Sequence, residues 1–170
     1  EAVSCTVTAE SRAYDGTEYA GAVVNNWITE KTGEAAVTYY EGTGDTDYPE
    51  NENAPVNAGT YKFVVKIADV TAYAEFEIQR LDQNVEFDVI DYTFGDSVEA
   101  PAVTGAQEDP VIEYYYTTEN SNTDGTLWEN SRSADPGTYY MYAKVCATTN
   151  YNEYVTQPVQ FTVAKREAPT

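Results

Sequence analysis

The sequence of 170 residues has no histidine, a single methionine and only two cysteines. Without histidine, Ser-His-Asp and Cys-His catalytic arrangements and histidine metal sites are excluded. Cys5 and Cys146 lack a Cys-x-x-Cys spacing, which argues against zinc binding or redox chemistry. Acidic residues offer many carboxylate pairs, but no local signature selects one for acid–base work. We therefore expect no enzyme and no cofactor.

Positive charge is also scarce. Nine Lys and Arg stand against 29 Asp and Glu, for a net charge of −20. Phosphate recognition needs clustered cations, so nucleic acid and anionic membrane surfaces are not expected partners. No apolar run reaches the roughly 18 residues of a spanning helix, so membrane insertion is not expected either. The composition favours a solvated, acidic, monomeric protein.

One stretch of sequence occurs twice, at residues 57–68 and 135–146. The offset is constant, because 137 − 59 = 78 for the glycines and 139 − 61 = 78 for the tyrosines that follow them. A repeat of this length predicts two modules, residues 1–80 and 81–170, each with its own core. The junction at residues 80–84 is not rich in Gly and Ser, so we expect limited hinge motion.

Both copies alternate with period two, which is typical of a strand with one buried face. We expect one parity to be buried: Tyr61, Phe63, Val65 and Ile67 in the first copy, and Tyr139, Met141, Ala143 and Val145 in the second. Lys62 and Lys66 should be exposed. With 16 Tyr and many short runs of Val and Thr between turn signals, the sequence predicts an all-β chain of two immunoglobulin-like β-sandwich modules.

Strands are expected at ten places: residues 3–9, 22–28, 35–40, 59–68, 73–79, 85–90, 98–104, 111–118, 137–147 and 157–164. On this assignment Cys5 faces the first core, whereas Cys146 faces outward or is half covered. In an end-to-end pair of modules the two lie beyond the ~7 Å Cα separation of a disulfide. Both are predicted to be free thiols.

Several motifs resemble the YDG/MBG-type immunoglobulin-like repeats of bacterial cell-surface proteins. They are residues 13–17 (Ala-Tyr-Asp-Gly-Thr), 54–61 (Ala-Pro-Val-Asn-Ala-Gly-Thr-Tyr), 92–97 (Tyr-Thr-Phe-Gly-Asp-Ser), 134–140 (Ala-Asp-Pro-Gly-Thr-Tyr-Tyr) and 150–152 (Asn-Tyr-Asn) followed by 158–165. The resemblance implies long arrays that act as stalk, spacer or adhesive segments outside the cell. The chain also starts and stops within repeat-like sequence, so we expect a piece of a longer protein.

Oxygen-bearing residues at alternate positions mark one weak calcium candidate, Asn120, Asn122 and Asp124, before Gly125. The position that a closing Glu would occupy is Ser131. The other interpretation is a polar loop. The same choice applies to the acidic loop that carries Asp45, Asp47, Glu50 and Glu52. An isopeptide crosslink through Lys62, Lys66 or Lys144 is a further hypothesis, although nothing in the nearby sequence selects a partner for these lysines.

Aromatic residues of the second module are the ligand-binding candidates: Tyr140, Tyr142, Tyr114, Tyr116 and Trp128. If these rings are exposed in one plane, they can stack on a sugar. The other interpretation is that they pack across strands, or that they form an apolar surface on which the segment inserted around residues 152–156 lies. Trp27 of the first module belongs to the same hypothesis.

The expected function is a non-catalytic stalk, spacer or adhesion segment of a secreted or surface-bound bacterial protein. Its expected partners are neighbouring repeats and a host or dietary glycan or protein. The alternative is a carbohydrate-binding module.

Overall fold

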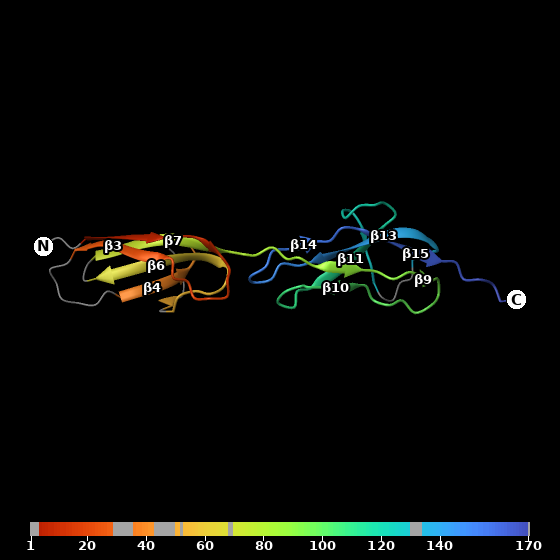
Figure 1. Ribbon diagram of the computed structural model, residues 1–170, viewed down its shortest axis with the longest axis horizontal. Helices are drawn as coiled ribbons and strands as arrows, with labels where there is room; N and C mark the ends of the chain where they lie inside the picture. The colour runs from red at the N-terminus through yellow and green to blue at the C-terminus, as the bar shows by residue number, and fades with distance from the viewer. Residues whose placement is uncertain are drawn as a thin grey trace. The chain divides into compact units, whose positions relative to one another are not determined.

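The computed structural model describes residues 4–28, 36–42, 50–51, 53–67, 70–129 and 134–169. Every regular element among them is a strand, so the expected all-β class is confirmed. The chain divides into two compact units, Glu1–Leu81 and Asp82–Thr170, one residue from the expected boundary (Figure 1). None of the described segments forms a helix long and apolar enough to cross a membrane.

Among the described residues, each unit contains one larger and one smaller sheet. The strands of the first unit are β1 (Ser4–Ala9), β2 (Arg12–Ala13), β3 (Ala22–Ile28), β4 (Ala36–Glu41), β5 (Glu50–Asn51), β6 (Gly59–Ile67) and β7 (Val70–Gln79). Those of the second are β8 (Glu86–Asp88), β9 (Tyr92–Thr93), β10 (Ala102–Thr104), β11 (Ile112–Thr117), β12 (Thr126–Leu127), β13 (Gly137–Val145), β14 (Tyr154–Val155) and β15 (Val159–Ala164).

The two units share one strand order. The larger sheet runs β2-β7-β6-β4-β5 in the first unit and β9-β15-β13-β11-β12 in the second. The smaller sheets are the antiparallel pairs β1-β3 and β8-β10. Apolar side chains of the smaller sheet, such as Val7 in the first unit and Phe87 in the second, pack against the core of the larger one. This two-layer arrangement is that of a β-sandwich.

Burial in β6 and β13 follows the expected parity. Tyr61, Phe63 and Val65 are buried in the first unit, and Met141, Ala143 and Val145 in the second, whereas Tyr139 is half-buried. Lys66 is exposed as expected. The side chain of Ile67 lies outside the described residues.

The opposite face of β6 is less open than the sequence predicts. Val64 stands in register between Thr38 and Tyr73 and is only 5% exposed. Lys62 was expected to be exposed but is half-buried, because its Nζ lies 4.2 Å from the centre of the Tyr73 ring. Cross-strand neighbours therefore cover part of the face that alternation alone assigns to solvent.

The Gly-Thr-Tyr turn has the same internal hydrogen bond in both units. The hydroxyl of Tyr61 donates to the carbonyl oxygen of Asn57, and that of Tyr139 donates to the carbonyl oxygen of Asp135, each over 2.8 Å. A Cβ added at Gly59 would lie 3.1 Å from the Tyr61 Oη, and one at Gly137 would lie 3.3 Å from the Tyr139 ring. The tyrosine folds back over the glycine, and this close approach explains why the two residues recur together.

A short leading strand closes the larger sheet of each unit. β2 runs parallel to β7, with Arg12 opposite Ile78, and β9 runs parallel to β15, with Tyr92 opposite Val163. Each parallel pair is followed by one further backbone bond. The Tyr14 amide donates to the Gln79 carbonyl, and the Phe94 amide donates to the Ala164 carbonyl, both over 2.9 Å.

Cys5 and Cys146 are both free and half-buried. The expectation of unbridged thiols is therefore confirmed. Cys146 lies directly after β13, where its amide donates to the carbonyl oxygen of Val111 over 2.9 Å.

Candidate functional site

The five aromatic candidates lie on two opposite faces of the larger sheet in the second unit. Tyr114 and Tyr116 belong to the core side, where Trp128 is 7% exposed and meets Tyr114 edge-on at 6.2 Å. Tyr116 meets Tyr139 edge-on at 5.9 Å. These three candidate rings are packing elements of the core, because alternation along β11 turns both tyrosines inward. Trp128 is therefore buried in the core, as in the packing interpretation, and not exposed for sugar stacking.

Tyr142 lies on the other face of the sheet and is 6% exposed. Its ring stacks on Tyr115, with centroids 5.4 Å apart and planes 14° apart, and its hydroxyl accepts a hydrogen bond from the Gly125 amide over 3.0 Å. A Cβ at Gly125 would come within 2.9 Å of the Tyr142 ring, so the loop touches it directly. Tyr140 is half-buried. The five rings therefore form no common open shelf.

The inserted segment has a different place from the one expected. Instead of lying over Tyr142, it continues the sheet, because β14 pairs with the end of β13 after β15 has paired only as far as Met141. Thr156 fastens it, since its Oγ1 accepts from the Ala143 amide and its own amide donates to the Ala143 carbonyl, both over 2.9 Å. The cover of Tyr142 comes from Tyr115 and Gly125.

The calcium candidates lie in the loop that contacts this insertion. The Asn122 amide nitrogen donates to the Thr156 carbonyl over 3.3 Å, which fixes the loop to the segment beside it. Asp124 has a left-handed backbone, with φ of 59°, and Asn120 is exposed. No group of three acidic, Cys or His side chains suited to a metal occurs in the described part of the chain. Ser131 and the acidic residues Asp45, Asp47 and Glu52 lie outside the described residues.

The lysine of the second unit that was considered for a crosslink is engaged with carboxylates. The Lys144 Nζ lies 3.2 Å from Glu153, and the hydrogen bond that it donates to this carboxylate raises the pKa of the lysine. This contact is a surface ion pair, which contributes little to stability.

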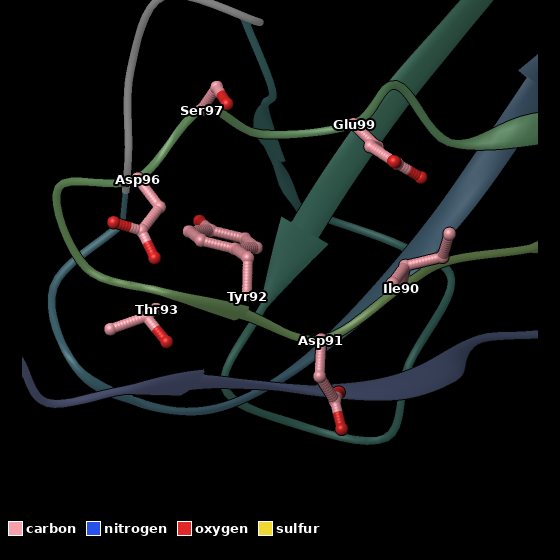
Figure 2. A pocket seen from close by; sticks show the side chains of 7 residues that line it. All are labelled: Ile90, Asp91, Tyr92, Thr93, Asp96, Ser97 and Glu99. Atoms are coloured by element: carbon pink, nitrogen blue, oxygen red, sulfur yellow. The ribbon is translucent and has the colours of Figure 1, made fainter.

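A hollow lies beside β9 in the described part of the second unit. It has a volume of about 340 Å³ and is lined by Ile90, Asp91, Tyr92, Thr93, Asp96, Ser97 and Glu99. Figure 2 shows the Tyr92 ring in the middle of these residues. A second hollow of about 210 Å³ adjoins β9 and reaches Thr162 and Ala164. We call the larger hollow the β9 cleft.

The cleft is held by a turn and by the last strand. The Asp96 amide donates to the Thr93 carbonyl over 3.0 Å, and Gly95 between them has a φ of 84°. Asp91 Oδ1 accepts from the Thr162 amide over 2.7 Å, and Asp96 Oδ1 accepts from the Arg166 guanidinium. One oxygen of each carboxylate is thereby used, and the other remains for a hydrogen-bond donor.

Tyr92 forms the fixed wall of the cleft. Its ring stacks on Phe161, with centroids 6.2 Å apart, and its hydroxyl accepts from the Ala134 amide over 3.2 Å. Acceptor oxygens beside an aromatic wall suit a ligand with several hydroxyl groups. The sequence analysis identified residues 92–97 only as a repeat motif and not as part of a binding site. The available signal was three carboxylates and three hydroxyl groups within nine residues, 91–99.

No protein-family model matches the chain, and no curated protein matches it. The likeness to bacterial surface repeats therefore depends on the sequence motifs alone.

Proposed function

We propose that the chain is a non-catalytic tandem-repeat segment of a larger extracellular bacterial surface protein, where it acts as a stalk, spacer or adhesion segment. The carrying observation is the parallel pairing of the leading and final strands in each unit, β2 with β7 and β9 with β15. Two complete cores, one per unit, support the same proposal, because each module of a stalk has to be stable by itself.

Parallel pairing at the ends of a module resists a pulling force. β2 lies near the start of the first unit and β7 at its end, so tension on the two ends pulls these strands in opposite directions. The hydrogen bonds between β2 and β7 then bear the force together, in shear. Because β1 precedes β2 in the chain, this happens once the pairing of β1 with β3 has been lost. β9 and β15 have the same arrangement in the second unit.

Removing the Phe94 amide, which bonds to Ala164, tests whether this pairing bears the force. Phe94 precedes Gly95, whose φ of 84° is that of the third residue of a type II turn, and proline is favoured at the second position. Thr93 before it is already in a strand, as the residue before a proline prefers. Phe94→Pro should keep the turn and delete only the bond to Ala164.

Single-molecule force spectroscopy on the whole chain measures the effect. We expect two unfolding events in the wild type and, in Phe94→Pro, one event shifted to lower force. Phe94→Ala is the matched control, because it removes the 40%-exposed ring but keeps the amide. An unchanged pair of forces in Phe94→Pro, or an equal drop in Phe94→Ala, contradicts the proposed load-bearing role.

Carbohydrate binding is the second candidate function, and the β9 cleft is the observation that favours it. Affinity electrophoresis in gels containing neutral polysaccharides should retard the wild-type chain. Glu99→Gln should lose that retardation, whereas Glu75→Gln, an equal charge change on the exposed face of β7, should keep it. Tyr140→Ala tests the original aromatic hypothesis in the same gel. Equal mobility with and without each polysaccharide removes this candidate.

A further inference from the structure

The buried polar side chains in the described part of the chain all belong to the second unit. They are Gln83, Asn150 and Thr156, which are 4%, 3% and 4% exposed. A buried polar group destabilises a fold unless it is hydrogen-bonded, so such side chains specify definite partners. Thr156 fastens β14 to β13 through Ala143. Gln83 and Asn150 join segments that are distant in sequence.

Gln83 holds residues 82–85, the lead segment through which the chain enters β8. Its Nε2 donates to the carbonyl oxygen of Asn152 over 2.8 Å, and its Oε1 accepts from the Gln107 amide over 3.3 Å. The Asp82 carboxylate accepts from the Asn152 side chain over 2.8 Å. Both polar atoms of one buried side chain are therefore bonded, each to a different part of the second unit.

The loop after β10 touches the same lead segment. Gly105 has a φ of 87°, and a Cβ added there would lie 2.9 Å from the carbonyl oxygen of Asn84 and 3.7 Å from the Cα of Val85. Val85 is itself only 8% exposed. The lead segment therefore contacts both this loop and Asn152.

The segment that carries Asn152 is fixed in turn. We call residues 146–153, between β13 and β14, the strap. The Thr148 amide donates to the Tyr151 carbonyl over 3.0 Å, and the Tyr151 amide donates to the Thr148 hydroxyl oxygen over 3.2 Å. Asn150 donates to the Glu108 carboxylate from its side chain and from its amide. The strap is therefore held by its own turn and by a neighbouring loop.

The strap lies where the second unit has additional sequence. The repeat offset is 137 − 59 = 78 at the glycines, but 164 − 79 = 85 at the ends of the final strands, where Tyr14 and Phe94 make equivalent bonds. The second unit therefore has 85 − 78 = 7 more residues between these points. Both larger sheets have the same strand order, so the sandwich itself does not require the addition.

We propose that the strap locks the lead segment to the second unit and fixes the direction in which the chain enters it, so that bending between the units takes place before Asp82. The inference does not depend on the proposed stalk role. It adds a tertiary cause of stiffness at the junction to the composition of the junction itself.

Backbone 15N relaxation of the whole chain measures the order of the lead segment. We expect order parameters of about 0.85, the value of rigid backbone, for residues 83–85. Gln83→Glu loses the donor to Asn152 but keeps an acceptor for Gln107, and should lower these values below about 0.6 while the amides of β13 stay unchanged. Gln157→Glu makes the same charge change at an exposed glutamine and should have no effect.

Asn152→Ala is the second variant, because it removes the bond to Asp82 but keeps the carbonyl oxygen that Gln83 uses. It should lower the order parameter of Asp82 most, and it decides the outcome if Gln83→Glu unfolds the second unit. A lead segment that is as mobile in the wild type as a flexible linker overturns the proposal. So does a lead segment whose order is the same in the wild type and in Asn152→Ala.

Discussion

The hydroxyl of Tyr139 donates a hydrogen bond to the carbonyl oxygen of Asp135, four residues earlier, over 2.8 Å. Tyr61 makes the same bond to Asn57 in the other unit. A turn that is built twice with the same bond offers two independent measurements of one interaction. It also ties the start of the central strand to the residues that lead into it.

Removing this hydroxyl should have a modest cost in either unit. Tyr139→Phe and Tyr61→Phe are each expected to lower the free energy of unfolding by about 1 kcal/mol, the net value of a typical intramolecular hydrogen bond. Urea denaturation followed by tyrosine and tryptophan fluorescence measures the loss. An effect in one unit but none in the other would show that the two turns are not equivalent.

Truncating the core should destabilise one unit at a time. Phe63 is 4% exposed and meets Tyr39 at 5.2 Å, and Phe161 is 1% exposed in the other unit. Phe63→Ala and Phe161→Ala should each cost about 3–5 kcal/mol. Calorimetry of the whole chain should show one transition lowered and the other unchanged. Phe94→Ala, at an exposed ring, is the control with little expected effect.

Glu108 should make the second unit sensitive to acid. Its carboxylate accepts from the Asn150 side chain over 2.7 Å and from the Asn150 amide over 3.1 Å. The hydrogen bond from the Asn150 side chain is the largest cause that holds the pKa of Glu108 below its ordinary value. A hydrogen bond with the Thr148 side chain is the second cause. Asn150 is itself 3% exposed, so it depends on this partner.

The sign of the pH dependence follows from that lowered pKa. A carboxyl group with a folded pKa below its unfolded value, about 4.3, stabilises the fold above that pH, and the stabilisation is lost as pH falls through the folded pKa. The urea midpoint of Glu108→Gln should therefore lie below that of the wild type at neutral pH and approach it in acid. Glu99→Gln serves as the control. A gap that persists unchanged in acid would contradict this role for Glu108.

Much of the fold follows from local sequence. Alternation in β6 and β13 predicted that the side chains of Phe63, Val65, Met141 and Val145 are buried. The repeat offset predicted that the two strands are equivalent. The strand expected at residues 98–104 is observed only as Ala102–Thr104. Pro101 stands directly before it, and proline is disfavoured inside a sheet.

The remaining features depend on contacts distant in sequence. Trp128 follows a strand of two residues, too short for alternation to reveal which way its ring points. Tyr142 has the parity of an exposed residue, but Tyr115 from a neighbouring strand and Gly125 from a loop cover it. The β9 cleft requires the parallel pairing of β9 with β15, about 70 residues later in the chain.

Separating the two units tests most directly the claim that the chain is a pair of self-sufficient β-modules. Residues 1–81 and 82–170, expressed as two fragments, each contain a complete core cluster. Chemical denaturation of each fragment should give a single cooperative transition, with dispersed amide resonances before it. A fragment that is unfolded by itself, or that unfolds without cooperativity, would contradict the account.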